Sequence, residues 1–369
     1  MLLESFRERV KTVREFMSYN GIDSLLLSKC CNFSWFTFGG RSHITLNATE
    51  GEASILITED SIHLLTNNIE LQRLMDLEID SSLHGQFEIQ EYPWYERPVG
   101  ERKIVESLAR GRLFSDTGRY GTQVVDLVSI RSALSEYEIE TYSTLGKECD
   151  EIFSEKIHTL TPAMTELDVQ AIMYGAMAER DIEPVLTLAF SEESSLTYRH
   201  NLSRNSKLGM RGFVSICARR KGLVVSSSRS FMFDDFPEIR EQHARNCYVD
   251  SVAIASSRPG ARLSDIFEKI KEAYSSQNAK GEWEKHHQGG SAGYMPREMV
   301  ANPYASLVLK VGSAVAWNPT IKGTKSEDTA VICSRENSII SFPESSVWPS
   351  ISFEIGDQKI RRPDVLLLK

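Results

Sequence analysis

The chain has 369 residues, of which 41% are hydrophobic and 25% are charged, and its formal net charge is -9 at pH 7. This length exceeds one ordinary hydrophobic core and predicts two domains, and the composition excludes a disordered or fibrous protein. The acidic charge disfavours nucleic acid or an anionic membrane as a partner, because neither attracts an acidic surface. We therefore expect a small molecule or a short peptide as the substrate, with no nucleic-acid and no membrane partner.

The cysteines and the amino-terminal segment indicate the compartment. The six cysteines are scattered and include no CxxC pair, which favours a reduced environment. The segment MLLESFRERVKTVREF is charged from Glu4 onward and lacks the apolar core of a signal peptide, and no apolar run approaches the length of a membrane span. We predict a cytoplasmic protein.

Residues 1–131 predict a mixed α/β domain. Apolar side chains recur at three- and four-residue steps over residues 5–19, which indicates an amphipathic helix that ends near Asn20-Gly21. Short apolar runs separated by turn residues then predict the strands of a mixed sheet: IDSLLLS, ASILIT and SIHLLT.

Residues 132–369 predict a second domain, which begins with two helices. Ser135 and Glu138 have the spacing of a capping box before the first helix, and Thr165 and Asp168 repeat that spacing before the second. After residue 210 the pattern changes to strands with a hairpin signal, GFVSICARRKGLVVSSSRSF. One further helix, SDIFEKIKEAY, precedes strands that continue to the end.

Four stretches of this second domain resemble, in order and spacing, the aminopeptidase P, prolidase and creatinase family: TPAMTELDVQ, the hairpin above, HHQGGSAG and AWNPTIKGTKSEDT. The first domain is similar as well, in GIDSLLL, NFSWFTFGG, GEASILIT and LTNNIE. The resemblance covers nearly the whole chain. It implies an α/β (α+β) fold with a creatinase-like mixed α/β domain at residues 1–131 and a pita-bread domain at residues 132–369. Fold does not fix chemistry, however.

Metallopeptidases of this family hold two divalent ions with two aspartates, one histidine and two glutamates, because such cations need anionic oxygen and nitrogen donors. The resemblance puts Ser215 and Ser226 at the aspartates, Gly290 at the histidine and Asn318 at the first glutamate. Only the position of the second glutamate keeps a residue that can bind metal, Glu327. One ligand in five cannot hold two ions, so we predict no metal and no other cofactor.

The stretch HHQGGSAG carries two adjacent histidines, His286 and His287. Adjacent side chains of an extended segment point to opposite sides, and no carboxylate or cysteine stands at a ligand spacing beside them. The stretch also lacks the spacing and the lysine of a phosphate-binding P-loop. We expect the two histidines to contact substrate rather than a metal ion.

Polar residues near these positions suggest how such a site could work without metal. The resemblance puts His200 where creatinase, a metal-independent relative, uses a histidine in proton transfer, and an imidazole pKa of roughly 6.5 suits that role. A loop histidine that caps the backbone is the alternative. Strand alternation predicts that Lys325 shares the face of Glu327, either to supply positive charge near the substrate or to form a structural ion pair.

Arg297-Glu298 takes the position of the family's His-Glu, where the arginine either anchors a substrate carboxylate or closes the rim with a salt bridge. No aspartate-histidine relay can be assigned to the serines at 226–228, which disfavours a serine hydrolase. The predicted catalytic residues are His200 and Glu327. The predicted substrate-binding residues are Arg199, Arg219, Ser215, Ser226, His286, His287, Arg297, Glu298, Asn318 and Lys325.

Three functions stay open. The first is a metal-independent hydrolase or lyase that acts on a C–N bond of a small amino-acid-like or guanidino substrate. The second is a pseudoenzyme that only binds a peptide or metabolite, as the pita-bread domain of the Spt-sixteen type of histone chaperone is thought to do. The third is an Xaa-Pro aminopeptidase or dipeptidase. The resemblance also implies a homodimer in which Trp35, Arg41 or His43 could reach the neighbouring subunit's site.

Overall fold

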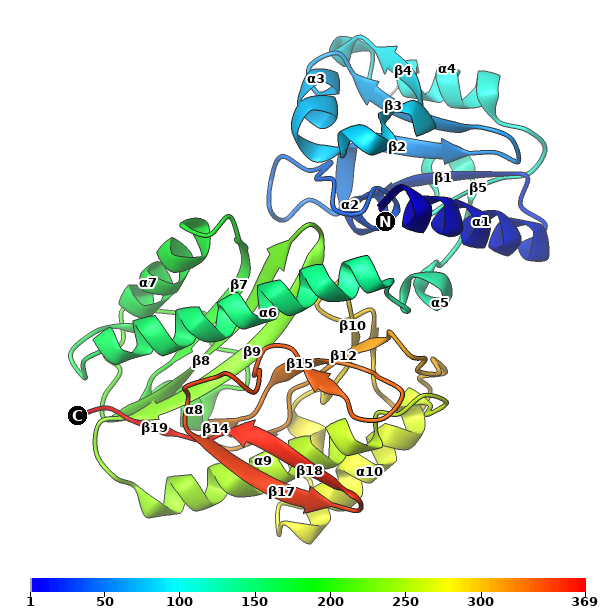
Figure 1. Cartoon of the computed structure of the whole chain (residues 1–369). Helices are drawn as coiled ribbons and strands as arrows, with labels where there is room; N and C mark the ends of the chain where they lie inside the picture. The colour runs from blue at the N-terminus through cyan, green and yellow to red at the C-terminus, as the bar shows by residue number, and fades with distance from the viewer. Residues whose placement is uncertain (1, 98) are drawn as a thin grey trace. The chain divides into compact units, whose positions relative to one another are not determined.

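The computed structural model describes residues 2–97 and 99–369 (Figure 1). The chain divides into two compact units, Met1–Arg131 with Lys221–Leu223, and Ser132–Arg220 with Val224–Lys369. Each unit contains its own β-structure. No helix in the described residues is long and apolar enough to cross a membrane.

The first unit is built on a mixed sheet, which has six strands among the described residues, in the order β4-β3-β2-β1-β5-β6. Its strands are β1 (Ser24–Lys29), β2 (Glu50–Ile57), β3 (Ile62–Asn67), β4 (Glu88–Tyr92), β5 (Leu113–Ser115) and β6 (Gln123–Val124). Its α-helices are α1 (Leu2–Asn20), α2 (Cys30–Phe36), α3 (Leu71–Arg73), α4 (Val99–Leu108) and α5 (Val128–Arg131). It also has a short π-helix, η1 (Leu74–Glu78), and the short 3₁₀ helices η2 (Ser81–Gln86), η3 (Trp94–Glu96) and η4 (Arg119–Gly121). Antiparallel pairing joins β1, β2 and β3, and parallel pairing adds β4, β5 and β6.

The amphipathic pattern places α1 against this unit's core. Phe6, Val10, Val13 and Met17 are buried along one face of the helix, as the periodicity predicts. Phe6 also makes edge contacts with the rings of Phe36 and Phe87, at centroid distances of 5.4 and 5.5 Å. The helix begins three residues before the predicted start and ends at the predicted place.

The second unit, all of whose residues are described, contains a four-stranded sheet, β19-β9-β8-β7, and a five-stranded sheet, β11-β10-β12-β15-β16. Its strands are β7 (Glu183–Phe190), β8 (Arg211–Arg220), β9 (Leu223–Met232), β10 (Gly289–Ala292), β11 (Met299–Val300), β12 (Ala314–Trp317), β13 (Thr320–Ile321), β14 (Thr324–Lys325), β15 (Asp328–Val331), β16 (Ser338–Ile339), β17 (Ser350–Ile355), β18 (Gln358–Pro363) and β19 (Leu366–Leu367). Its helices are α6 (Glu136–Lys156), α7 (Glu166–Ala178), α8 (Glu192–Thr197), α9 (Pro237–Ser256) and α10 (Leu263–Ser276), with short turns η5 (Ile157–Thr159) and η6 (Glu282–Lys285). Helix α6 packs against α7 and β8, and α9 packs against α10 and the β17–β18 hairpin (Figure 1).

Local signals in the sequence start the helices and the hairpin of this unit. Both predicted capping boxes form: the carboxylates of Glu138 and Asp168 accept hydrogen bonds from the backbone N–H groups of Ser135 and Thr165, each at 2.8 Å. The turn between β8 and β9 has positive φ at Lys221 (49°) and Gly222 (77°). Such a turn matches the twist of the paired strands, so it fixes which residues of β8 and β9 face each other.

Candidate functional site

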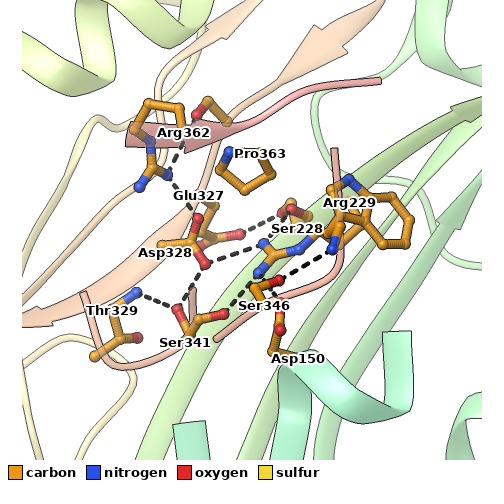
Figure 2. A network of polar contacts seen from close by, with 12 residues as sticks. Asp150, Ser228, Arg229, Glu327, Asp328, Thr329, Ser341, Ser346, Arg362 and Pro363 are labelled. Carbon is orange, nitrogen blue, oxygen red and sulfur yellow. Dashed lines mark hydrogen bonds and ion pairs between the residues drawn. The ribbon is translucent and has the colours of Figure 1, made fainter. Parts of the chain in front are cut away.

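Glu327 is the centre of a buried polar group in the second unit. It lies between β14 and β15, and its side chain is 4% exposed. Its Oε1 accepts a hydrogen bond from Arg297 Nη2 at 2.8 Å, and its Oε2 contacts Lys325 Nζ at 2.9 Å. Ser228 Oγ of β9 donates to the same Oε2 at 2.8 Å (Figure 2). The predicted shared face of Lys325 and Glu327 is thus confirmed.

These contacts keep Glu327 ionised. Burial by itself would raise the pKa of this carboxyl group, but the charges of Lys325 and Arg297 and the hydrogen bonds from Lys325 and Ser228 outweigh burial and lower the pKa to about 2. The site therefore holds one carboxylate between two cations at neutral pH.

Hydroxyl groups of the β8–β9 hairpin extend this cluster. The oxygens of Ser215 and Ser228 are 2.7 Å apart, and because the Ser228 proton goes to Glu327, Ser215 is the donor to Ser228. Ser226 accepts a hydrogen bond from Arg297 Nη1 at 3.0 Å and lies 3.4 Å from the sulfur of Cys217. We call Ser215, Ser226, Ser228, Arg297, Lys325 and Glu327 the Glu327 cluster.

Three histidines form a second group beside this cluster. His200 follows α8, and His286 and His287 follow η6. The Nε2 atoms of His200 and His286 are 3.1 Å apart, and the rings of His286 and His287 stack at a centroid distance of 4.5 Å. The expectation that adjacent rings point to opposite sides is wrong, because the chain bends at His286 and strand β10 begins only at Gly289.

The three imidazoles are neutral near pH 7. Burial, followed by the positive charge of Lys325, lowers the pKa of His200 and lowers that of His286 to about 2, and Glu327 opposes both shifts. Burial and the charge of Arg297 lower the pKa of His287 to about 4. The charges of Lys325, Arg297 and Glu327 therefore act on the protonation of all three histidines.

The remaining predicted residues lie outside these two groups or at their edge. Arg199 contacts Glu282 at 2.5 Å and Thr320 at 2.9 Å, and Arg219 pairs with Glu183 of β7 at 2.5 Å. Asn318 is buried, and its Oδ1 has no hydrogen-bond partner among the described residues.

Glu298 accepts a hydrogen bond from the backbone N–H of Tyr294 at 3.0 Å, which helps to shape the loop after β10. Trp317 belongs to the core, where its Nε1 donates to Ser257 at 2.9 Å.

Sequence reasoning missed a buried charge network that adjoins the cluster. Asp328, next to Glu327, contacts Arg229 Nη1 at 3.0 Å and Arg362 Nη2 at 2.7 Å (Figure 2). The two arginines also reach Asp150 and Asp250, at 3.0 and 2.6 Å. The side chains of Arg229, Arg362, Asp250 and Asp328 are fully buried. We call Asp328, Arg229, Arg362, Asp150 and Asp250 the Asp328 network. The role of Ser228 was also missed, although alternation from Ser226 would have placed it on the same face.

Comparison with known proteins identifies the family. The second unit matches the model of metallopeptidase family M24 over residues 140–340. The fold is similar to that of the prolidase from Pyrococcus horikoshii OT3, with a TM-score of 0.75 at 19% identity over 92% of this chain and 100% of that chain. An Xaa-Pro dipeptidase from Bacillus anthracis gives a TM-score of 0.72 at 16% identity over 91% of this chain and 97% of that one.

The N-terminal domain of the FACT complex subunit SPT16 from Cicer arietinum gives a TM-score of 0.71 at 11% identity, over 93% of this chain and 97% of that one. Comparison with curated protein sequences finds no match. The predicted α/β fold, a mixed N-terminal domain followed by a pita-bread domain, is confirmed by these structures. The chain belongs to metallopeptidase family M24.

Proposed function

We propose that this M24 protein has lost the two-metal centre of its family. Four of the five positions that the resemblance assigns to metal ligands carry Ser215, Ser226, Asn318 and Gly290, which offer no carboxylate and no imidazole. Neutral hydroxyl and amide groups are weak ligands for divalent ions when anionic donors are lacking.

The backbone at Gly290 supports this proposal. A Cβ atom added there would lie 2.1 Å from the carbonyl oxygen of Met299 and 2.9 Å from the backbone nitrogen of Ala301. Strand β11 pairs with β10 at this point, Val300 opposite Gly290. A histidine side chain would therefore require the two strands to separate, so the position does not fit an imidazole ligand.

The positive charges around Glu327 also disfavour the binding of metal ions there. Both of its oxygens are already used, by Arg297 on one side and by Lys325 and Ser228 on the other. A dication bound to Glu327 would have to displace these contacts and would then face the two freed positive charges. The residues present do not fit a pair of metal ions.

We infer that the protein is a metal-independent hydrolase or lyase that acts on a C–N bond of a small amino-acid-like or guanidino substrate. The observation that carries this inference is the Nε2–Nε2 contact of 3.1 Å between His200 and His286, next to an ionised Glu327. In hydrolysis, His200, the more exposed of the two and neutral at pH 7, would take a proton from the attacking water and give it to the departing nitrogen; its lowered pKa makes it a weaker base in the first step and a stronger acid in the second.

The Glu327 cluster suggests how a substrate would be held. The carboxylate of Glu327 already receives a guanidinium group, that of Arg297, at 2.8 Å. A guanidino or amino group of a substrate could take the place of Arg297, whose freed guanidinium could then contact a substrate carboxylate. The unpartnered Oδ1 of Asn318 offers one further acceptor.

Turnover assays with chelator present test this function. The full chain would be incubated with creatine, guanidino acids, cyclic amino-acid derivatives and Xaa-Pro dipeptides, and product would be measured by mass spectrometry. We expect turnover of a guanidino or amino-acid-like compound that His200→Ala abolishes and that His158→Ala, a change of an exposed histidine in η5, leaves intact. Absence of any His200-dependent turnover would reject the inference.

Two other outcomes point to the other functions. Substrate-like compounds that raise the melting temperature with concentration but yield no product would indicate a protein that only binds. In parallel assays without chelator, Xaa-Pro cleavage that chelator then abolishes would instead indicate a metal-dependent peptidase.

A further inference from the structure

The three histidines have the arrangement of a small metal site that differs from the family's two-ion centre. His200, His286 and His287 each offer one ring nitrogen, and these nitrogens all lie within 4.8 Å of one another. The ring centroid of His200 is 4.8 Å from that of His286 and 5.8 Å from that of His287. Two separate segments thus bring three nitrogen donors to one point.

The distances suit coordination of one ion. With metal–nitrogen bonds of about 2.05 Å, two nitrogens 3.1 Å apart subtend an angle of about 100° at the ion, close to a tetrahedral angle. The third nitrogen has to approach by a small side-chain rotation. His200 and His287 are exposed, so a rotation is open to both side chains, but a rotation of His287 has to give up its stacking on His286.

One buried atom of the group has no partner in the protein. The Nδ1 of His286 is buried and has no hydrogen-bond partner among the described residues. A bound ion could either use this nitrogen directly or take the Nε2 that now contacts His200. In the second case the imidazoles exchange a single weak mutual contact for coordination bonds.

The chemistry of the donors selects the ion. Three imidazoles without a carboxylate favour borderline cations such as Zn²⁺, Ni²⁺, Cu²⁺ or Co²⁺ over Mg²⁺, Ca²⁺ or Mn²⁺. Three protein ligands leave a fourth position open to water or substrate. The charges of Lys325 and Arg297 would repel the ion, and the carboxylate of Glu327, which contacts both, offsets one of these two charges.

We propose that His200, His286 and His287 bind a single borderline transition-metal ion. This site uses none of the five positions of the family's two-ion centre. Binding would occupy the ring nitrogens that the proposed proton transfer needs, so the ion would inhibit that reaction; only this consequence rests on the proposed function.

Calorimetric titration of the chelator-treated full chain with Zn²⁺ tests the binding itself, without substrate. We expect about one ion per chain, and at least a tenfold loss of affinity in His287→Asn and in His286→Asn. Glu327→Gln should leave the stoichiometry unchanged, and His158→Asn is the matched control. Titration with Co²⁺ should give the intense visible absorption of a tetrahedral site.

Absence of Zn²⁺ binding by the wild-type protein would overturn the proposal. Binding that survives His287→Asn and disappears in Glu327→Gln would overturn it as well, because it would assign the ion to the Glu327 cluster. Since His287 is exposed, its substitution should not prevent folding. Failure of the turnover assays would leave these results untouched.

Discussion

Glu327 and Asp328 are neighbours in the chain, and each lies between two cations, yet their side chains lie in different environments. Asp328 faces Arg229 and Arg362, and all three side chains are fully buried. Glu327 faces the opposite way, toward Lys325 and Arg297, and Arg297 remains 10% exposed. Strand alternation thus separates a sealed charge network, which holds β9, β15 and β18 together, from a cluster that stays near solvent and next to the histidines.

The two sites also differ in how they can respond to the loss of a carboxylate. An arginine stays protonated in a protein, whereas a buried lysine can release its proton. Loss of the carboxylate at 328 leaves two permanent, fully buried charges with one carboxylate each, Asp150 and Asp250, whereas loss at 327 leaves one permanent charge, on the partly exposed Arg297, and one lysine that can be neutralised. This difference is the basis of the first two predictions.

The largest effect is expected from Asp328→Asn, which should lower the free energy of unfolding by about 3–5 kcal/mol because Arg229 and Arg362 lose a shared partner in a buried site. Denaturant unfolding measures it. Asp357→Asn removes a partner of Arg258 at the exposed surface and serves as a control with a far smaller effect. Equal losses in both variants would contradict a structural role for the Asp328 network.

Glu327→Gln should cost less, about 1–3 kcal/mol, because Lys325 can become neutral and Ser228 can still donate a hydrogen bond to the amide oxygen. The same unfolding experiment compares it with Asp328→Asn. If the Gln variant proves the less stable of the two, the distinction between the sealed network and the Glu327 cluster is wrong.

The pH dependence of stability should also differ between the two sites. Burial raises the pKa of Asp250, the partner of Arg362, to about 6. Its unfolded pKa is lower, so the folded state binds more protons, and this group's contribution is lost as the pH rises from about 4 through 6. The pKa of Glu327 is lowered instead, so its contribution is present above about 4.5 and is lost as the pH falls toward 2.

Unfolding free energies of the wild type and of Asp250→Asn, measured between pH 4 and pH 7, test this sign. The difference between the two proteins should change between about pH 4 and pH 6 and level off above pH 6, because only in this range does the folded wild type hold a proton on residue 250 that its unfolded state has released. A difference that stays constant over this range would show that Asp250 does not titrate in it.

The smallest effect is expected from Ser215→Ala. It removes the donor to Ser228 but leaves the bond between Ser228 and Glu327 in place, so the cost should be about 1 kcal/mol. Thermal unfolding measures it. A much larger loss would mean that Ser215 contacts Glu327 more directly than the hydroxyl chain suggests.

Local signals in the sequence predicted the framework of the molecule. Ser135 with Glu138 and Thr165 with Asp168 start their helices as expected, because a capping box involves residues only three positions apart. The alternation that joins Lys325 to Glu327 is equally local. The fold of the second domain could be predicted because four sequence motifs occur in the same order as in the family. Each of these motifs corresponds to turns and strands of the family's fold.

The rest of the site depends on contacts between distant residues. Arg229 meets Asp150 and Asp328 from 79 and 99 positions away, and neither spacing leaves a signal in the sequence. The stacking of His286 on His287 depends on a bend that alternation could not foresee, and the approach of His200 spans 86 positions. Predictions of the homodimer and of a cytoplasmic location stay predictions.

Titration of the full chain with Mn²⁺, followed by electron paramagnetic resonance, tests the loss of the two-metal centre most directly. Mn²⁺ prefers carboxylate ligands and should bind poorly to three imidazoles, so it reports on the positions around Glu327 rather than on the histidines. We predict that Mn²⁺ stays free and that no spin-coupled pair appears. Two tightly bound Mn²⁺ ions per chain, lost in Glu327→Gln, would contradict it.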